Sequence, residues 1–209
     1  EKLGIVIGDV SGKAMKAAMV AVMSNGMVQS GAKSCTSPSG FMATLNHSMC
    51  IKTDERMFTA LCFGSLGTRD GSFNFSNAGI NPPLLKRGCR VSRMTVPGPC
   101  LPLGAFDDTV YRDRTIGLEA GDVLVLFTDG VTEARNRNGE FFESQKLEQI
   151  LARMDTGGMT AGDILSSIVQ SVSLFSGNRP PEDDMTVIVI KVNGNRYAAA
   201  GDRLLHMAG

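Results

Sequence analysis

Apolar residues recur along the chain in two periods, and each period predicts a different kind of element. Short apolar runs that are rich in β-branched residues predict strands buried in a core. The strongest such runs cover residues 3–8, 123–127 and 185–190. Weaker runs between turn residues predict further strands over residues 58–66, 72–76, 84–85, 91–96 and 109–116.

Other segments have the spacing of amphipathic helices. They cover residues 13–30, 37–52, 143–154 and 160–175. Ser11 is placed to cap the first helix, and Pro38 suits the first turn of the second. The predicted buried face of the first helix carries Met15, Ala18, Met19, Val22, Met23, Gly26 and Met27. Strands combined with helix pairs predict an α+β fold, in which two antiparallel sheets have helices outside them.

Composition narrows the function classes. The 209 residues include 21 basic and 21 acidic side chains, so the net charge of zero does not favour nucleic acid or an anionic membrane surface as a partner. No apolar stretch approaches the roughly 20 residues that a membrane-spanning helix needs. The five cysteines are odd in number and lack CxxC spacing, which favours a reduced, cytoplasmic location over a disulfide framework or a zinc site.

Aspartates lie at the ends of the three strongest apolar runs. Asp9 ends the first run, Asp129 follows the second, and Asp183 and Asp184 precede the third. A carboxylate at the rim of a buried strand is costly unless a positive charge neutralises it. If the sheets bring these rims together, the carboxylates form a cage suited to hard divalent cations. Such a cage suggests that a metal-activated water attacks a phosphoester.

Each aspartate motif also has a plain structural explanation. Asp9 with Ser11 is typical of a strand that ends in a turn and caps a helix. Asp129 followed by Gly130 is most often only a turn. The adjacent acids Asp183 and Asp184 are typical of a solvated rim. The hypothesis of a metal site therefore depends on the joint occurrence of the three motifs.

As an ordered set, the motifs resemble the SpoIIE-type, RsbU-like phosphatases, which are the bacterial branch of the metal-dependent PPM (protein phosphatase 2C-like) phosphatases. The resemblance covers residues 1–193, and residues 194–209 are expected to be a tail or a linker. The motifs are IGDVSGK at 7–13, NAGINPPLL at 77–85, PLG at 102–104, GDVL at 121–124, FTDGVTEA at 127–134 and DDMTV at 183–187.

The resemblance implies a PPM-type fold, with a central antiparallel β-sandwich flanked by helix pairs and a binuclear Mn²⁺ or Mg²⁺ centre at one edge. It implies that Asp9 bridges the two metals and that the backbone carbonyl of Val10 ligates one of them. Asp129 would complete the first metal site and Asp183 the second. Asp184 would orient these ligands rather than bind metal, and Gly130 would lie beside them in the surrounding shell.

The implied activity is hydrolysis of phosphoserine or phosphothreonine, with a phosphorylated STAS-domain anti-sigma-factor antagonist as the usual substrate. Sensory domains commonly precede such phosphatases, and a Gly-Gly-Asp type strand motif that supplies a further acid would lie before Glu1. Two departures from the family pattern remove no metal ligand: Ala14 replaces a common glycine, and Ile80 replaces a common histidine.

Two other classes of function stay open from the sequence. The first is a phosphatase-like binding module that sequesters a sigma-regulatory partner with weak catalysis or none. The second is a metal-binding structural domain or a small-molecule phosphoesterase. The retention of Asp9, Asp129 and Asp183 favours an enzyme over a scaffold, because a pure binding module has no need for costly rim carboxylates.

Overall fold

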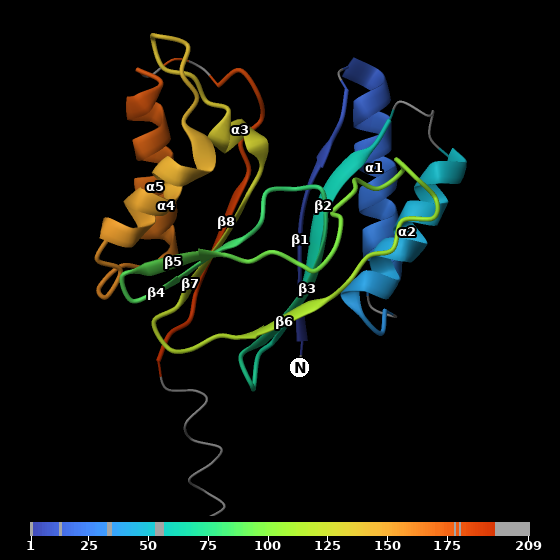
Figure 1. Cartoon of the computed structure of the whole chain (residues 1–209), viewed down its shortest axis with the longest axis horizontal. Helices are drawn as coiled ribbons and strands as arrows, with labels where there is room; N and C mark the ends of the chain where they lie inside the picture. The colour runs from blue at the N-terminus through green and yellow to red at the C-terminus, as the bar shows by residue number, and fades with distance from the viewer. Residues whose placement is uncertain are drawn as a thin grey trace, which may run out of the picture. The chain divides into compact units, whose positions relative to one another are not determined.

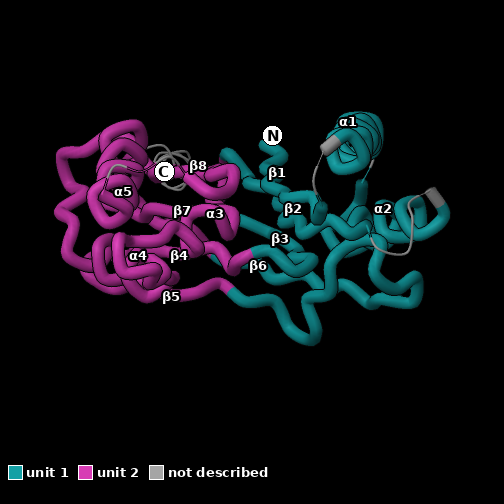
Figure 2. The backbone as a smooth tube through the Cα atoms, turned by 90° about the horizontal axis from the view of Figure 1, so that it is seen from above, with its two compact units in different colours: residues 1–68, 72–80, 95–116 teal, residues 69–71, 81–94, 117–209 magenta. Residues whose placement is uncertain are grey.

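The computed structural model describes residues 2–12, 14–32, 35–52, 57–177, 179 and 181–194. The chain divides into two compact units, which Figure 2 colours separately. Unit 1 comprises residues 1–68, 72–80 and 95–116, and unit 2 comprises residues 69–71, 81–94 and 117–209. The predicted tail at 194–209 lies outside the described residues except for Gly194.

Unit 1 is built on a sheet with the strand order β1-β2-β3-β6. Its elements are β1 (Lys2–Val10), α1 (Ala14–Gly31), α2 (Pro38–Lys52), β2 (Thr59–Gly67), β3 (Ser72–Ala78) and β6 (Arg114–Gly117). β1 pairs antiparallel with β2, and β2 pairs antiparallel with β3. α1 and α2 lie together beside this sheet (Figure 1).

Unit 2 repeats this plan with a sheet in the order β5-β4-β7-β8, in which neighbouring strands run antiparallel. Its elements are β4 (Leu84–Arg87), β5 (Arg90–Arg93), β7 (Val123–Phe127), α3 (Asp129–Thr132), α4 (Glu143–Arg153), α5 (Ala161–Phe175) and β8 (Val187–Lys191). α4 packs against β5 and β4, and α5 packs against β8. The predicted α+β organisation, with antiparallel sheets and helix pairs, is confirmed.

Each unit has its own hydrophobic core. In unit 1, α2 contributes Phe41, Met42, Leu45 and Met49, which pack with Leu61 and Phe63 of β2 and with other buried residues. In unit 2, every residue of β7 is buried, and the core forms with Leu147 and Leu151 of α4 and with Ile164, Ile168 and Val172 of α5. The capping box at the start of α5, in which Thr160 and Asp163 bond each other's backbone and side chain, fixes where that helix begins.

Four strand predictions differ from the structure. The run at 91–96 becomes the shorter strand β5, and of the run at 109–116 only the end enters β6. The predicted burial of the first and last runs is also wrong: β1 buries only Ile5 and Ile7, and β8 is half-buried along its length. Among the described strands, both lie at the edge of their own sheet, with a paired strand on one side only.

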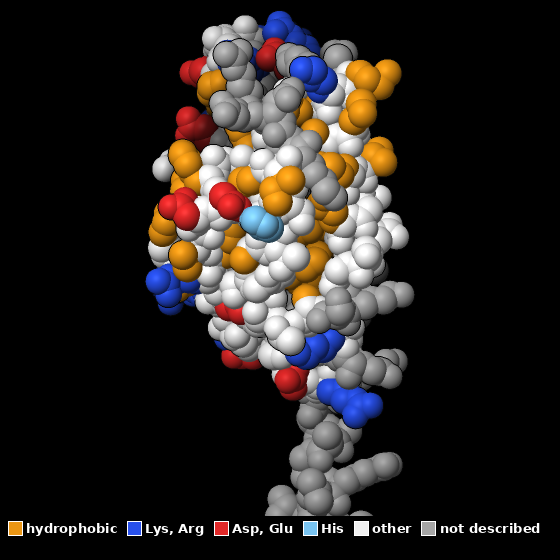
Figure 3. Space-filling model, turned by 90° about the vertical axis from the view of Figure 1, so that its right-hand side faces the viewer, with side chains coloured by type: hydrophobic (Ala, Val, Ile, Leu, Met, Phe, Trp, Pro, Cys, Tyr) orange, Lys and Arg blue, Asp and Glu red, His pale blue; other side chains and the backbone are white. Residues whose placement is uncertain are grey.

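The predicted buried face of α1 is confirmed for Met23 and Met27, which are half-buried and pack against the core of unit 1, and is wrong for its other members. Met15, Met19 and Val22 have exposed fractions of 73%, 65% and 73%, whereas Val20 and Ser24 are buried. Apolar residues occupy the whole circumference of this helix, so the spacing could not identify the side that packs. Figure 3 faces α1 and α2 and shows hydrophobic side chains gathered on this surface. Among the described helices, none is long and apolar enough to cross a membrane.

Candidate active site

Asp9 and Val10 end the edge strand of unit 1, where they pair with Ala60 and Thr59 of β2. The ladder continues one residue further, because Ser11 donates its N–H to the carbonyl of Phe58 and accepts the Phe58 N–H on its hydroxyl, each at 2.9 Å. That hydroxyl, predicted to cap α1, therefore fastens the strand end, and Lys13 lies outside the described residues. The pairing holds the half-buried residue Asp9 and the peptide of Val10 at a fixed strand end.

Asp129 stands at the end of the fully buried strand β7, as the first residue of the short helix α3. The residue is half-buried, but its Oδ1 atom is fully buried and has no hydrogen-bond partner within the described part of the chain. A buried carboxylate oxygen without a donor is costly, because it loses water and gains nothing in return. A bound cation would compensate this oxygen, which could serve as one of its ligands.

The segment before β8 is fastened to the end of β7 through Thr128. The Thr128 hydroxyl accepts the Thr186 N–H at 2.9 Å and donates to the Asp184 carbonyl at 3.3 Å. The Thr128 N–H donates to the Thr186 carbonyl at 3.1 Å. Next to it, a Cβ on Gly130 would lie 2.3 Å from the Asp184 carbonyl oxygen, so only glycine fits there. The two neighbours of Asp129 in the chain therefore contact the segment that follows Asp183.

The side chains of Asp183 and Asp184 are exposed, so the expectation of costly buried carboxylates holds in part for Asp129 and is wrong for these two. They precede β8 by three residues or more and lie on the solvent side of the loop. Asp183 Oδ1 accepts the Asp184 N–H at 2.8 Å, which sets the conformation of the loop. Asp183 also lines a small cavity of about 150 Å³, together with Gly130, Glu133, Ala134, Arg135, Phe141 and Glu182.

The donor set of unit 2 suits a hard cation. Carboxylate oxygens are the ligands that Mg²⁺ and Mn²⁺ prefer, and no described group donates a hydrogen bond to the buried Asp129 Oδ1. Within the described ranges, no three His, Cys, Asp or Glu side chains already form a metal-binding group. Asp9 belongs to unit 1 and the other acids to unit 2, and each unit is described by itself. The participation of Asp9 and Val10 in one centre with Asp129 and Asp183 stays a prediction.

Sequence reasoning missed a hairpin beside these acids. Arg135 and Phe141 form a bridge, and the guanidinium carbon of Arg135 lies 4.3 Å from the centroid of the Phe141 ring. Arg135 Nε also lies 3.5 Å from Glu182 Oε2. The turn residues Asn138-Gly139 are a signal that could have revealed the hairpin.

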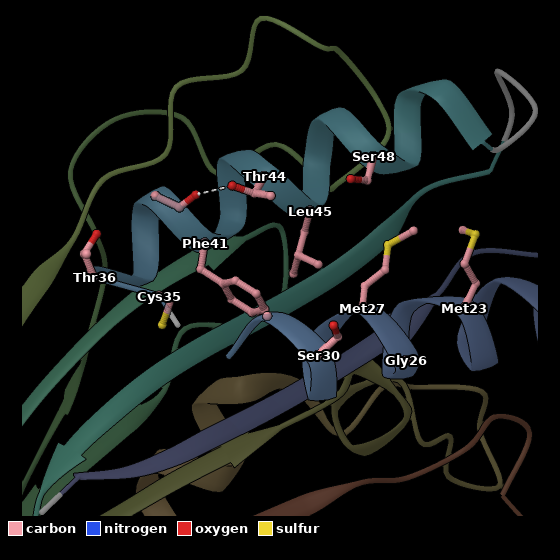
Figure 4. A pocket seen from close by; sticks show the side chains of 12 residues that line it. Met23, Gly26, Met27, Ser30, Cys35, Thr36, Phe41, Thr44, Leu45 and Ser48 are labelled. Atoms are coloured by element: carbon pink, nitrogen blue, oxygen red, sulfur yellow. Dashed lines mark hydrogen bonds between the residues drawn. The ribbon is translucent and has the colours of Figure 1, made fainter. Parts of the chain in front are cut away.

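A larger cavity, in unit 1, has a different chemistry. It is a groove of about 710 Å³ between α1 and α2. Figure 4 shows Met23, Met27, Phe41 and Leu45 around it, together with small polar residues. None of the described residues that line it is charged, so they offer neither ligands for a hard cation nor a counter-charge for phosphate. The candidate active site therefore lies with the aspartates.

Comparison with known proteins agrees with the motifs. The sequence profile of the family described as "Stage II sporulation protein E (SpoIIE)" matches residues 1–193. The phosphoserine phosphatase RsbU of Bacillus subtilis (strain 168) is 28% identical over 191 residues, which cover 91% of this chain and 56% of RsbU. The chain thus spans little more than half the length of this relative.

Solved structures share the fold. The PP2C phosphatase domain of SpoIIE from Bacillus subtilis, solved with a fragment of its regulatory domain, matches with a TM-score of 0.75 and 21% identity. The match covers 92% of this chain and 54% of that one. RsbX in complex with magnesium matches with a TM-score of 0.65 and 16% identity over 90% of this chain and 80% of that one. The predicted PPM-type, PP2C-like fold is confirmed by these similarities.

Proposed function

We propose that this chain, which belongs to the SpoIIE family, is a metal-dependent protein phosphatase that hydrolyses phosphoserine or phosphothreonine. The observation that carries the proposal is the buried Oδ1 of Asp129, which has no hydrogen-bond partner among the described residues. The neighbours of Asp129, Thr128 and Gly130, lie against the carbonyl of Asp184, which follows Asp183. In an enzyme that binds a divalent cation, such an oxygen serves as a metal ligand. In a carboxylate with a purely structural role, the same unpaired oxygen only costs stability.

The proposed ligands are the carboxylates of Asp9, Asp129 and Asp183 and the backbone carbonyl of Val10. We propose that they hold two Mn²⁺ or Mg²⁺ ions, in keeping with the magnesium bound to RsbX. When bound, such ions lower the pKa of water toward neutrality and offset the charge of the phosphoryl oxygens. Asp184 contributes through its backbone carbonyl, which accepts the Thr128 hydroxyl and so orients the Asp183 loop.

The surroundings of Asp129 and the family resemblance support further parts of the proposal, namely a preordered site, the substrate and the compartment. The buried rim at Thr128 and Gly130 keeps the Asp129 carboxylate in place, so little ordering is left to occur when substrate arrives. We propose a phosphorylated STAS-domain anti-sigma-factor antagonist as substrate, and a sensory domain elsewhere in the complete protein as regulator. All five cysteines are free thiols, which supports a reducing compartment, and we propose the cytoplasm.

One observation favours the alternative of a phosphatase-like binding module that sequesters a sigma-regulatory partner. The described residues hold no preformed group of three metal-binding side chains. Release of phosphate from a phosphoserine peptide, measured with Mn²⁺ and with EDTA, separates the two. An enzyme releases phosphate only with the metal and loses this activity in Asp129→Asn. A binding module releases none under either condition, and a small-molecule phosphoesterase prefers a small ester such as p-nitrophenyl phosphate.

A further inference from the structure

A positively charged side chain that the metal hypothesis does not use lines the cavity beside Asp183. Of the described residues that line this cavity, Arg135 alone carries a positive charge. Its other charged lining residues are Glu133, Glu182 and Asp183. A phosphoryl group is a dianion near neutral pH, so a site that admits it must offset both its charge and that of these acids. Bound cations supply part of this charge, and Arg135 is placed to supply the rest.

The hairpin that carries Arg135 is well fastened. The Phe142 N–H donates to the Ala134 carbonyl at 2.9 Å, and the Asn136 N–H donates to the Glu140 carbonyl at 3.0 Å. In the turn, Asn136 Oδ1 accepts the N–H groups of Asn138 and Glu140 at 2.9 and 3.0 Å. Such side-chain bonds to the backbone order the turn, so Arg135 starts from a defined position.

The guanidinium is held in a way that leaves it able to bind an anion. The ring of Phe141 lies against it at 4.3 Å, a cation–π contact that orients the group. The ion pair with Glu182 is long, at 3.5 Å, and the two side chains are 45% and 71% exposed. An exposed pair of this kind contributes little energy, so a better acceptor can displace Glu182. The planar guanidinium matches two oxygens of a phosphoryl group.

We infer that Arg135 binds the phosphoryl group of the substrate, displacing Glu182 while its guanidinium stays on the Phe141 ring. This inference rests on the proposed phosphatase function and adds a substrate-binding residue to it. The step is an exchange of ion pairs, in which no covalent bond forms or breaks. Arg135 thus orients the phosphoryl oxygens in the cavity that Asp183 and Gly130 line.

Steady-state kinetics of the whole chain with saturating Mn²⁺ test the inference. We expect Arg135→Gln to raise KM roughly ten- to hundredfold, the range for a hydrogen bond to a charged group. The rise should be similar for a phosphoserine peptide and for p-nitrophenyl phosphate, because both present the same phosphoryl group. Arg135→Lys, which keeps the charge but not the fork, should give an intermediate KM. Arg137→Gln is the matched control, because Arg137 is an exposed arginine on the same hairpin that does not line the cavity.

Calorimetry supplies a readout that is independent of turnover. Mn²⁺ should bind Arg135→Gln as it binds the wild type, whereas inorganic phosphate should bind the Mn²⁺-loaded variant more weakly. Unchanged KM and unchanged phosphate affinity in an active, folded Arg135→Gln would overturn the inference and leave the phosphatase proposal standing. A KM effect confined to the peptide would also overturn it, because Arg135 would then contact the protein part of the substrate. If the wild type hydrolyses nothing, the phosphatase proposal fails, and equal phosphate binding by the wild type and Arg135→Gln would overturn the inference as well.

Discussion

Gly130 lies against the backbone carbonyl of Asp184 so closely that a Cβ atom on residue 130 would meet the carbonyl oxygen at 2.3 Å. Real Cβ atoms essentially never approach another atom so closely, and here the neighbour is backbone that cannot rotate away. Each partner adjoins a proposed metal ligand, since Gly130 follows Asp129 and Asp184 follows Asp183. The spacing of the two ligands therefore depends on the absence of a side chain at residue 130.

Gly130→Ala should push the Asp183 loop away from α3. We expect it to lower the free energy of unfolding by about 1–3 kcal/mol, the usual cost of overpacking, and to raise the Mn²⁺ concentration needed for half-maximal activity. Thermal unfolding and a Mn²⁺ titration of phosphate release measure the two effects. The control is Gly117→Ala, because a Cβ there meets open space. A Gly130→Ala protein with wild-type melting temperature and metal dependence would contradict this account.

Thr128→Val should loosen the same rim by a different route. The change keeps the buried volume but removes the hydroxyl that bonds to Thr186 and Asp184. Leaving these backbone groups unpaired should cost about 1–3 kcal/mol of unfolding free energy. Hydrogen exchange should speed up at the Thr186 N–H, whereas Thr44→Val, at an exposed helical position, should leave that amide unchanged. Equal exchange in both variants would mean that the hydroxyl does not hold the loop.

The sequence predicted those parts of the fold in which one local signal dominates. Strand β7 is apolar at every position and ends at an aspartate, so both its burial and its rim residue were visible. The start of the helix predicted over residues 160–175 was equally local, and the structure shows that a capping box of Thr160 and Asp163 sets it. The buried face of α1 could not be predicted from a local signal, because apolar residues surround that helix. Only packing decides that Val20 is buried and Met19 exposed.

The residues of the candidate site also differ in whether a local sequence signal marks them. Asp129 and Asp183 were singled out because Asp129 follows one strong apolar run, Asp183 precedes another, and both match family motifs. Their role as metal ligands stays a prediction. The contact between Gly130 and Asp184 could not, since it joins residues far apart in the chain and Asp-Gly alone indicates only a turn. Arg135 was missed because its proposed role depends on the register that sets it across from Phe141, and the sequence shows only the turn between them.

The core of unit 1 should lose stability in alkali because of Tyr111. Burial is the main cause that raises the pKa of this phenol to about 12, from an ordinary value of 10.0. Between these values the unfolded chain releases the proton and the folded chain keeps it, so the free energy of unfolding falls as pH rises from about 10 to 12. Tyr111→Phe should remove this contribution and flatten the profile over that window, as urea unfolding at several pH values would show. It should also lower stability at pH 7, because Asn46 and Leu101 lose a donor.

The sharpest test of the metal assignment compares two aspartates of unit 2 that differ in their partners. Asp122 is buried, receives two guanidinium nitrogens of Arg87 at 2.6 and 2.9 Å, and accepts the Glu119 N–H at 2.8 Å. Asp129 has a buried oxygen with no such partner in the described structure. In EDTA, Asp122→Asn should therefore lose roughly 2 kcal/mol of stability, as expected for hydrogen bonds to a charged group. Asp129→Asn should lose none and gain a little, because it removes an uncompensated charge.

Addition of Mn²⁺ should reverse the order of the effects: it should stabilise Asp122→Asn as it does the wild type, but stabilise Asp129→Asn far less. A ligand that binds only the folded state stabilises it by about 2.7 kcal/mol at a hundred times its Kd. The wild type and Asp122→Asn should both gain this increment, and Asp129→Asn should gain far less, because it has lost an anionic ligand. The measurement is the melting temperature with EDTA and with Mn²⁺ for the three proteins, together with phosphate release, which only Asp129→Asn should lose. If Mn²⁺ raises the melting temperature of Asp129→Asn as much as that of the wild type, Asp129 does not bind the metal.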